Sequence, residues 1–303
     1  MLDYPSTLGG LFKRFPDEKA CRDYLQEIRW PDGIHCPRCK SSRLWVRRHR
    51  PVLECGQCDH QVSILVGTIF QDTKLPLRTW FEAVWWLTNQ KSGISALGLK
   101  RAMDLNRLAT GWSMLHKLRI AMVRPNQDLL SGKIEVDEVF LGGVNHKELI
   151  GVAAQIDGQK TGRIRLQKIS NRSGPVLQGF VERHIKSGST VVTDGLNSYC
   201  GIEKRGYIHK PMRKPYCWEE KDGDADELLP RVHRVASLLK RWYYGTHHGR
   251  LEPKYLDAYL NEFTFRFNQR TSTNRGLLFY RLLENTATIR PASYAPTITK
   301  SKN

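Results

Sequence analysis

Hydrophobic positions change their spacing along the chain, and each change predicts a different kind of element. Residues 16–30 have the spacing of a short amphipathic helix that ends before Gly33. Apolar and polar residues then alternate between Leu44 and Val66, which predicts three short strands. From Pro76 the spacing becomes helical again. The N-terminal part is therefore expected to place helices on both sides of a small β-structure.

Three helices are predicted between residues 74 and 124. The first carries an apolar stripe formed by Trp80, Phe81, Val84, Trp85 and Leu87. A second, short helix is expected after Ser95, and a third after a break near Asp104. The last two helices have the outline of a helix-turn-helix, and a generic helical linker is the alternative.

Beyond Pro125 the chain alternates between strand-like and helical spacing. Strands are predicted at residues 133–143, 148–157, 163–170 and 189–195, and helices at residues 174–185, 231–249 and 254–270. The alternating Phe263, Phe265 and Phe267 leave helix and strand both open within the last segment. Three strands, a helix and a further strand indicate a mixed α/β layer fold.

Composition and charge narrow the function. The 303 residues are 40% hydrophobic and 26% charged, with a mean hydropathy of −0.49, which is typical of globular domains. Lys and Arg outnumber Asp and Glu by 48 to 30. The excess is spread over the chain, because residues 1–131 hold 20 basic and 12 acidic residues and residues 132–303 hold 28 and 18. Such a surface attracts polyanions, which favours nucleic acid; a membrane surface is the alternative partner.

Two further observations bear on location. No apolar run approaches the roughly 18–20 residues that a membrane span needs. The N-terminal residues also lack the cationic and apolar segments of a signal peptide. We therefore expect no membrane partner and a cytoplasmic, nucleoid-associated protein.

Four cysteines have the spacing of a zinc site. They form the pattern C-x2-C-x15-C-x2-C with Cys36, Cys39, Cys55 and Cys58. Each pair can present two thiolates to one tetrahedral ion, and four thiolates leave no open position, so the zinc is predicted to be structural. Disulfides are the alternative, which the two-residue gaps disfavour. Between the two pairs lie Arg47 and Arg48, which either bind DNA phosphates or form a solvated face.

Two aspartates follow apolar strands in the C-terminal part. Asp137 ends the run IEVD, and Asp194 ends the run VVTD. Carboxylates at neighbouring strand ends can share a divalent cation, and Mg²⁺ prefers such oxygen ligands. Metal ions held this way activate water and stabilise the leaving oxygen in phosphodiester cleavage. The alternative is that each aspartate serves as an ordinary turn or capping residue.

The combined motifs resemble a family of bacterial insertion-sequence transposases. The resemblance rests on the cysteine pattern, VDEVFLGG, TDG, HRVASLLKRWYYGTHHG and YLNEFTFRFNQR, and it covers roughly residues 10–285. It implies an N-terminal zinc ribbon joined to a DDE catalytic domain of ribonuclease H-like fold. It also implies that Asp137 and Asp194 are the first two catalytic carboxylates, and that the chain acts as a homodimer or larger assembly on DNA.

The third catalytic position departs from the family pattern. The family places Glu or Asn on a helix, with Lys or Arg seven residues later, whereas this chain has His233 before Lys240. A neutral histidine suits Mn²⁺ better than Mg²⁺, and a purely structural histidine is the alternative. Glu262 is the main candidate to replace it as third ligand. Glu227 and Glu138 also remain candidates to supply an oxygen.

Further basic residues are predicted to contact DNA or to be solvated. They are Arg107, Lys117 and Arg119 on the expected recognition helix, and Lys240 and Arg241 beside the expected catalytic site. The predicted domains are a helical segment at 1–33, a zinc ribbon at 34–70, a helix-turn-helix-like region at 74–124, a ribonuclease H-like domain at 132–286 and a polar tail at 287–303.

These inferences together predict a DNA transposase. It would bind the terminal inverted repeats of its element, cleave phosphodiester bonds with Mg²⁺ or Mn²⁺, and join the 3′-OH ends to target DNA. A non-catalytic zinc-ribbon regulator and a catalytically decayed transposase that still binds DNA are the alternatives.

The cysteine pattern yields a first testable prediction. Purified protein should contain one zinc per chain, and Cys55→Ser should lose it, because three thiolates bind the ion less tightly than four. Cys21→Ser is the matched control, since Cys21 has no partner at ligand spacing. Metal analysis that finds equal zinc in the wild type and in Cys55→Ser would contradict the assignment.

Overall fold

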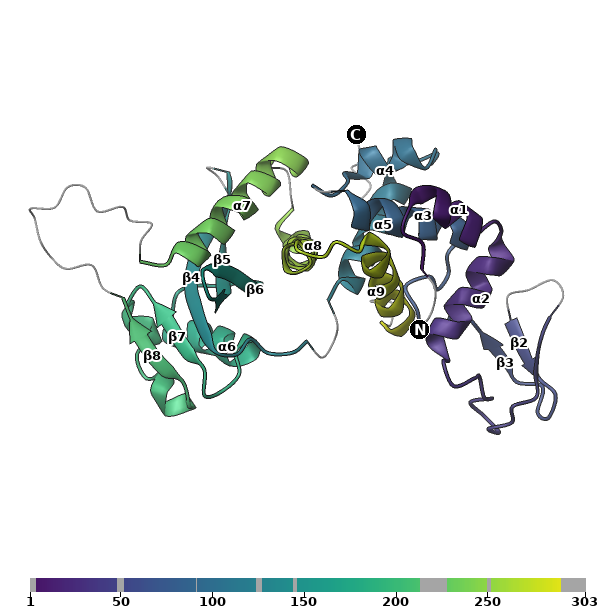
Figure 1. Ribbon diagram of the computed structural model, residues 1–303, viewed down its shortest axis with the longest axis horizontal. Coiled ribbons are helices and arrows are strands. Elements are labelled where there is room, and N and C mark those ends of the chain that lie inside the picture. Colours follow the sequence, from purple (N-terminus) through teal and green to yellow (C-terminus); the bar gives the residue numbers. More distant parts are fainter. Residues whose placement is uncertain are drawn as a thin grey trace, which may run out of the picture. The chain divides into compact units, whose positions relative to one another are not determined.

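The chain folds into two compact units (Figure 1). The computed structural model describes residues 4–47, 52–90, 92–123, 127–143, 146–212, 228–249 and 252–289. Unit 1 combines Met1–Pro125 with Thr273–Asn303, and unit 2 is Asn126–Ser272. Unit 1 contains helices and a small antiparallel sheet, whereas unit 2 contains a mixed sheet covered by helices. The multidomain α/β class is therefore confirmed.

Unit 1 contains the three predicted short strands and the four helices predicted at residues 16–30 and between residues 74 and 124. Its elements are α1 (Leu8–Arg14), α2 (Glu18–Arg29), β1 (Leu44–Val46), β2 (Val52–Cys55), β3 (Gln61–Ser63), α3 (Leu77–Asn89), α4 (Ala96–Ala102), α5 (Leu108–Ala121) and α9 (Arg275–Thr288). The strands form one antiparallel sheet in the order β1-β2-β3. Helices α1 and α9 were not predicted.

Side chains of helix α2 hold two neighbouring elements in place. The Glu18 carboxylate accepts hydrogen bonds from the backbone N–H groups of Leu77 and Arg78, at 3.0 and 2.9 Å. It thereby satisfies the first turn of α3, which has no side-chain cap of its own. At the other end of α2, the Arg29 guanidinium donates to the carbonyls of Ser63 and Val66, just after the last strand of the ribbon.

Helices α4 and α5 form the predicted helix-turn-helix outline. The Ser95 hydroxyl caps α4 by accepting from the Gly98 N–H at 3.0 Å. The two helices approach closely at Gly111, where an added Cβ would lie 3.0 Å from the carbonyl oxygen of Ala96. A side chain there would need the Ala96 backbone to move by a few tenths of an ångström, so glycine suits this close approach.

Helix α9 corrects the predicted domain boundary at residue 286. It packs against α2, α3 and α5, so it belongs to unit 1 rather than to unit 2. The burial of an aromatic side chain of α9 against helix α3 explains this placement. Phe279 is fully buried and packs edge-on against Phe81 and Trp85. The expected tail at 287–303 also begins too early, because α9 continues to Thr288; residues 290–303 lie outside the described residues.

Unit 2 is built on a five-stranded sheet in the order β6-β5-β4-β7-β8. Its elements are β4 (Lys133–Gly143), β5 (His146–Asp157), β6 (Lys160–Ile169), α6 (Gly174–His184), β7 (Thr190–Thr193), η1 (Asn197–Tyr199), η2 (Ile202–Arg205), β8 (Ile208–Pro211), α7 (Pro230–His247), η4 (Pro253–Tyr255) and α8 (Leu256–Asn268). Strands β4, β5 and β6 form an antiparallel meander, and β7 and β8 run parallel to β4. The predicted strands and helices are confirmed, and β8 was not predicted.

The two faces of this sheet have separate cores. Helices α7 and α8 cover one face, where Val139 and Val152 pack against Val235 and Phe263. Helix α6 covers the other face, with Phe180 among the residues packed against Val136. Because β4 alternates its side chains, neighbouring residues on it belong to different cores. Segment 254–270, left open between helix and strand, forms helix α8.

Helix α7 begins on a carboxylate supplied by the sheet. Glu135 of β4 accepts hydrogen bonds from the N–H groups of Arg231 and Val232, at 2.7 and 3.0 Å. The Arg231 guanidinium adds an ion pair of 3.3 Å to the same carboxylate, whose side chain is only 3% exposed.

In the described part of the chain, no helix is both long and apolar enough to cross a membrane.

The aromatic anchor of α9 can be tested. Phe279→Ala should destabilise unit 1 by about 3–5 kcal/mol, because it removes a fully buried ring from a packed cluster. Phe12→Ala, at a half-exposed phenylalanine of α1, should cost far less. Thermal unfolding of both variants measures the difference, and equal melting temperatures would contradict the placement of α9.

The anchor of α7 gives a second prediction. Glu135→Ala should leave the backbone N–H groups of Arg231 and Val232 without their acceptor, so α7 amides should exchange their hydrogens faster. Hydrogen exchange followed by mass spectrometry measures this locally. The control is Glu182→Ala, which breaks the exposed ion pair with Arg205. Unchanged protection of α7 in Glu135→Ala would refute the anchoring role.

Candidate functional site

The four predicted zinc ligands lie together in unit 1. The sulfur atoms of Cys36, Cys39, Cys55 and Cys58 are all within 4.8 Å of one another. The turns that follow β2 and precede β1 bring the two pairs together across the small sheet. Four thiol groups converging on one point fit a tetrahedral zinc ion and leave no place for a reacting ligand. The predicted cluster is confirmed, and its role is structural.

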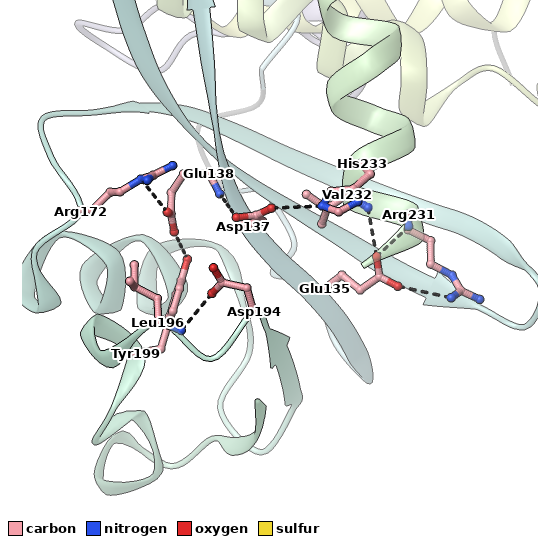
Figure 2. A network of polar contacts seen from close by, with 10 residues as sticks. All are labelled: Glu135, Asp137, Glu138, Arg172, Asp194, Leu196, Tyr199, Arg231, Val232 and His233. Carbon is pink, nitrogen blue, oxygen red and sulfur yellow. Dashed lines mark hydrogen bonds and ion pairs between the residues drawn. The ribbon is translucent and has the colours of Figure 1, made fainter. Parts of the chain in front are cut away.

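The two predicted aspartates come from adjacent parallel strands of unit 2. Strand β4 pairs with β7 in a register that sets Glu135 beside Val192. Asp137 lies two residues further along β4, and Asp194 directly follows the end of β7, so the two occupy neighbouring positions. Figure 2 shows the two carboxylates beside each other. Asp194 accepts a hydrogen bond from the Leu196 N–H at 3.0 Å, which fixes the turn after β7.

His233 joins this acid pair from helix α7. Its Nε2 lies 3.5 Å from Oδ2 of Asp137 (Figure 2). Glu135 explains this placement, because it binds the first turn of the same helix and faces the same side of β4 as Asp137. The structure thus brings together Asp137, Asp194 and His233.

The electrostatics of the site favour a bound cation. Burial raises the pKa of Asp137, and the neighbouring charge of Asp194 raises it further. The Glu138 N–H and the charges of His233 and Arg172 act in the opposite direction. Since an unneutralised carboxylate is disfavoured here, a divalent cation between the two aspartates would relieve both the burial and the repulsion. Asp137, Asp194 and His233 offer two hard oxygens and a nitrogen, a set that suits Mn²⁺ better than Mg²⁺. Among the described residues, however, only the four cysteines already hold three or more ligand atoms within 4.8 Å of one another, so a shared ion would have to draw these three side chains closer together.

The turn that carries Asp194 is supported from the edge of the sheet. The Thr193 hydroxyl is fully buried and lies 2.9 Å from Nε2 of His209 on β8. The Nδ1 atom of His209 lies 3.3 Å from the Glu203 carboxylate. The Thr193 hydroxyl also accepts a hydrogen bond from the Gly195 N–H at 3.2 Å. Strand β8 therefore holds the backbone on both sides of Asp194.

Glu138 does not join the acid pair. It follows Asp137 in β4 and so faces the α6 side of the sheet. There its carboxylate accepts a hydrogen bond from the Tyr199 hydroxyl and forms an ion pair with Nε of Arg172 at 3.2 Å (Figure 2). Both oxygens have partners on the α6 side of the sheet, so the geometry does not favour Glu138 as a ligand of a metal at the acid pair.

Glu262 also lies in a different environment from the acid pair. It is fully buried on α8 and pairs with Arg266 at 2.9 Å on the next turn of the same helix. The geometry therefore favours His233 over Glu262 as a third ligand. Glu227 lies outside the described residues.

The predicted DNA-contacting residues of unit 2 are accessible. Lys240 and Arg241 are both exposed on α7, and Lys240 is seven residues, or two turns, after His233. The predicted DNA-contacting residues of unit 1 differ in how exposed and how paired they are. Arg107 is exposed at the start of α5, while Arg47 is exposed and paired with Glu54 at 2.9 Å. Arg48 lies outside the described residues.

Two residues of the expected recognition helix must be corrected. Arg119 is 1% exposed, so it is buried in the helical core and does not face DNA. Lys117 is half-buried; its ammonium donates to the Gln71 carbonyl at 3.4 Å and lies 5.9 Å from the ring centre of Trp80. Burial lowers the pKa of Lys117. The error arose because basic residues were taken as solvent-facing, although α5 packs against α3, α4 and α9.

Sequence reasoning missed four residues of this site. Glu135 had a usable signal, because it precedes Asp137 by two in a strand and so shares its face. No such signal exists for Tyr199, His209 or Arg172, because each joins the site only through a side-chain contact with a residue distant in sequence.

Comparisons with known proteins agree with this arrangement. Residues 129–268 match the ISXO2-like transposase domain, and residues 16–61 match the transposase zinc-ribbon domain. The first match covers every described strand and helix of unit 2, and the second covers helix α2 and the cysteine cluster. Together the two matches span more than half of the chain.

Individual relatives are more distant. The chain is 24% identical over 277 residues to an uncharacterized protein in transposable element ISH50 of Halobacterium salinarum, covering 82% of this chain and 91% of the relative. It is also similar to a chain in the cryoEM structure of the simian T-cell lymphotropic virus intasome in complex with PP2A regulatory subunit B56 gamma. That match has 12% identity and a TM-score of 0.31, and covers 55% of this chain and 63%, less than two thirds, of the other. From its two matched domains, the chain belongs to the insertion-sequence transposases that join an N-terminal zinc ribbon to an ISXO2-like transposase domain.

Proposed function

We propose that this transposase cleaves DNA at the ends of its element and joins the 3′-OH ends to target DNA, using Asp137, Asp194 and His233 of unit 2. The observation that carries the proposal is the meeting of these three residues. Two carboxylates lie on adjacent parallel strands, and His233 approaches Asp137 to 3.5 Å. The sheet order, with helices on both faces, supports a ribonuclease H-like fold for this unit.

The chain's own residues prepare the reaction. Asp137 and Asp194 supply two anionic oxygens on one side of the sheet, and His233 supplies a nitrogen. Glu135 holds α7 in register, so that His233 stays beside Asp137. A divalent cation held there would polarise the phosphodiester and lower the pKa of an attacking water. Cleavage and joining are both in-line displacements at phosphorus, so one set of ligands serves both steps.

The partner follows from charge and from the family. The net charge of +18 favours binding of the DNA backbone. Lys240 and Arg241 are exposed on the helix that carries His233, where they are placed to contact phosphates near the site. The zinc ribbon and the helices α4 and α5, with Arg47 and Arg107 exposed, are the elements proposed to bind the terminal inverted repeats. Joining two ends in one event requires a homodimer or a larger assembly.

The catalytic residues can be tested directly. Asp137→Ala and Asp194→Ala should each lose strand cleavage by about a thousandfold with Mg²⁺ or Mn²⁺, because each removes a metal ligand. DNA binding should persist. Cleavage of plasmid DNA that carries an element end measures the effect. Full cleavage by the Asp137→Ala, Asp194→Ala double mutant would eliminate the enzymatic function and favour a DNA-binding regulator.

The third ligand is tested in the same assay. His233→Ala should impair cleavage strongly, and His233→Glu should keep or raise the Mg²⁺-supported rate, because it introduces a hard oxygen. Glu262→Gln, at a buried carboxylate paired with Arg266, is the control and should cleave DNA nearly as the wild type does. If His233→Ala is silent and Glu262→Gln is inactive, Glu262 is the ligand instead.

A further inference from the structure

The glutamate that follows Asp137 has a role of its own on the opposite face of the sheet. The side chain of Glu138 is only 3% exposed. A buried carboxylate is costly unless its oxygens are paired, and here both are paired, one with the Tyr199 hydroxyl and the other with Arg172. Glu138 therefore joins the strand that carries Asp137 to two segments distant in sequence.

The tyrosine end of this network is rigid. Tyr199 is 1% exposed, and it lies five residues after Asp194 in the turn η1. Gln178 of α6 donates to the carbonyls of Ser198 and Cys200, at 3.2 and 3.0 Å, on either side of it. Burial raises the pKa of Tyr199, so its hydroxyl remains a proton donor. One oxygen of Glu138 is thus committed to a fixed partner.

The arginine end is open to solvent. The Arg172 side chain is 48% exposed, in the loop between β6 and α6. Its Nε faces Glu138, and its guanidinium carbon lies 5.1 Å from the ring centre of Phe140, a residue that is itself 48% exposed. Among the described residues, the Arg172 guanidinium has no other hydrogen bond or ion pair. Its two terminal nitrogens are therefore held in place but available.

This arginine lies close to the acid pair. Its ion-pair partner Glu138 directly follows Asp137 in β4. Figure 2 shows Arg172 and Glu138 on one side of Asp137, with His233 on the other. A half-exposed ion pair adds little stability, so stability alone does not account for a buried glutamate that orients a solvent-facing arginine.

We propose that Arg172 binds a backbone phosphate of the DNA beside the cleaved bond, and that Glu138 and Tyr199 are positioning residues that hold it there. The inference rests on the proposed function of the acid pair. It identifies a substrate-binding residue and reassigns the glutamate of the VDE motif away from the metal.

The chemistry of the site favours a phosphate as ligand. The DNA backbone carries one negative charge per phosphate, so a fixed guanidinium near the acid pair would attract a phosphate that neighbours the cleaved bond. A guanidinium presents paired N–H donors that match two phosphate oxygens, and stacking on Phe140 leaves that edge free. A lysine at this position would offer a single charge without the paired N–H donors of a guanidinium.

The contact can be tested with DNA that lacks single charges. Duplexes carrying an element end are made with one phosphate at a time near the cleavage site replaced by neutral methylphosphonate. Binding of the full chain is measured by fluorescence anisotropy. At one position the wild type should lose about tenfold in affinity. The Arg172→Gln protein should bind unmodified DNA about tenfold more weakly than the wild type does. Methylphosphonate at the sensitive position should not weaken its binding any further, because the contact is already absent.

Two further measurements separate binding from structure. The logarithmic salt dependence of the Arg172→Gln complex should be shallower by about one phosphate contact. Arg172→Lys should recover part of the affinity, since it keeps the charge without the fork. Glu138→Gln, which keeps an acceptor for Tyr199 but loses the ion pair, should weaken the same phosphate position. The matched control is Arg205→Gln, which removes another exposed, glutamate-paired arginine and should bind as the wild type does.

The outcomes distinguish this inference from the proposed function. Asp137→Asn is assayed for cleavage in parallel. If Asp137→Asn is inactive while Arg172→Gln binds DNA with wild-type affinity and salt dependence, the phosphate contact is wrong and the acid pair stands. If Arg172→Gln instead weakens every methylphosphonate duplex equally, its effect is not a local contact and the inference also fails. If Asp137→Asn cleaves normally, the proposed function fails, whatever Arg172 does.

Discussion

The hydrogen bonds from the start of α7 to Glu135 are the constraint on which the meeting of Asp137 and His233 depends. A helix begins with backbone N–H groups that lack partners, and α7 obtains its acceptor from the middle of a buried strand. This fixes where the first turn of α7 lies over the sheet. His233 sits in that turn and therefore meets Asp137, which lies two residues after Glu135 on the same face of β4. One carboxylate thus aligns strand β4 with a helix whose first turn lies 96 or more positions later in the sequence.

Strand alternation divides the remaining acidic residues by role. Glu135 and Asp137 face α7, whereas Glu138 faces α6 and binds Tyr199 and Arg172. Three carboxylates within four residues therefore anchor a helix, complete an acid pair and orient an arginine. Strand β8 supports the other member of the acid pair, because His209 contacts the hydroxyl of Thr193, the residue immediately before Asp194.

Unit 1 uses the same device on a different element. Glu18 of α2 binds the first turn of α3, as Glu135 binds that of α7, and in each case the acceptor comes from another element. The C-terminal helix α9 then returns to this unit and buries Phe279 against Phe81 and Trp85. The domain that carries the zinc ribbon is consequently completed by residues that follow unit 2 in the sequence.

The sequence by itself determined the local features. Cysteine spacing specified the metal cluster, hydrophobic period predicted most strands and helices, and strand-end positions identified Asp137 and Asp194, because these signals depend on residues close together in the chain. Only the tertiary structure decided which distant groups meet. It placed His233 rather than Glu262 beside Asp137, paired Glu138 with Tyr199 and Arg172, buried Arg119 and returned α9 to unit 1. These outcomes depend on packing and pairing between segments far apart, for which no local pattern exists.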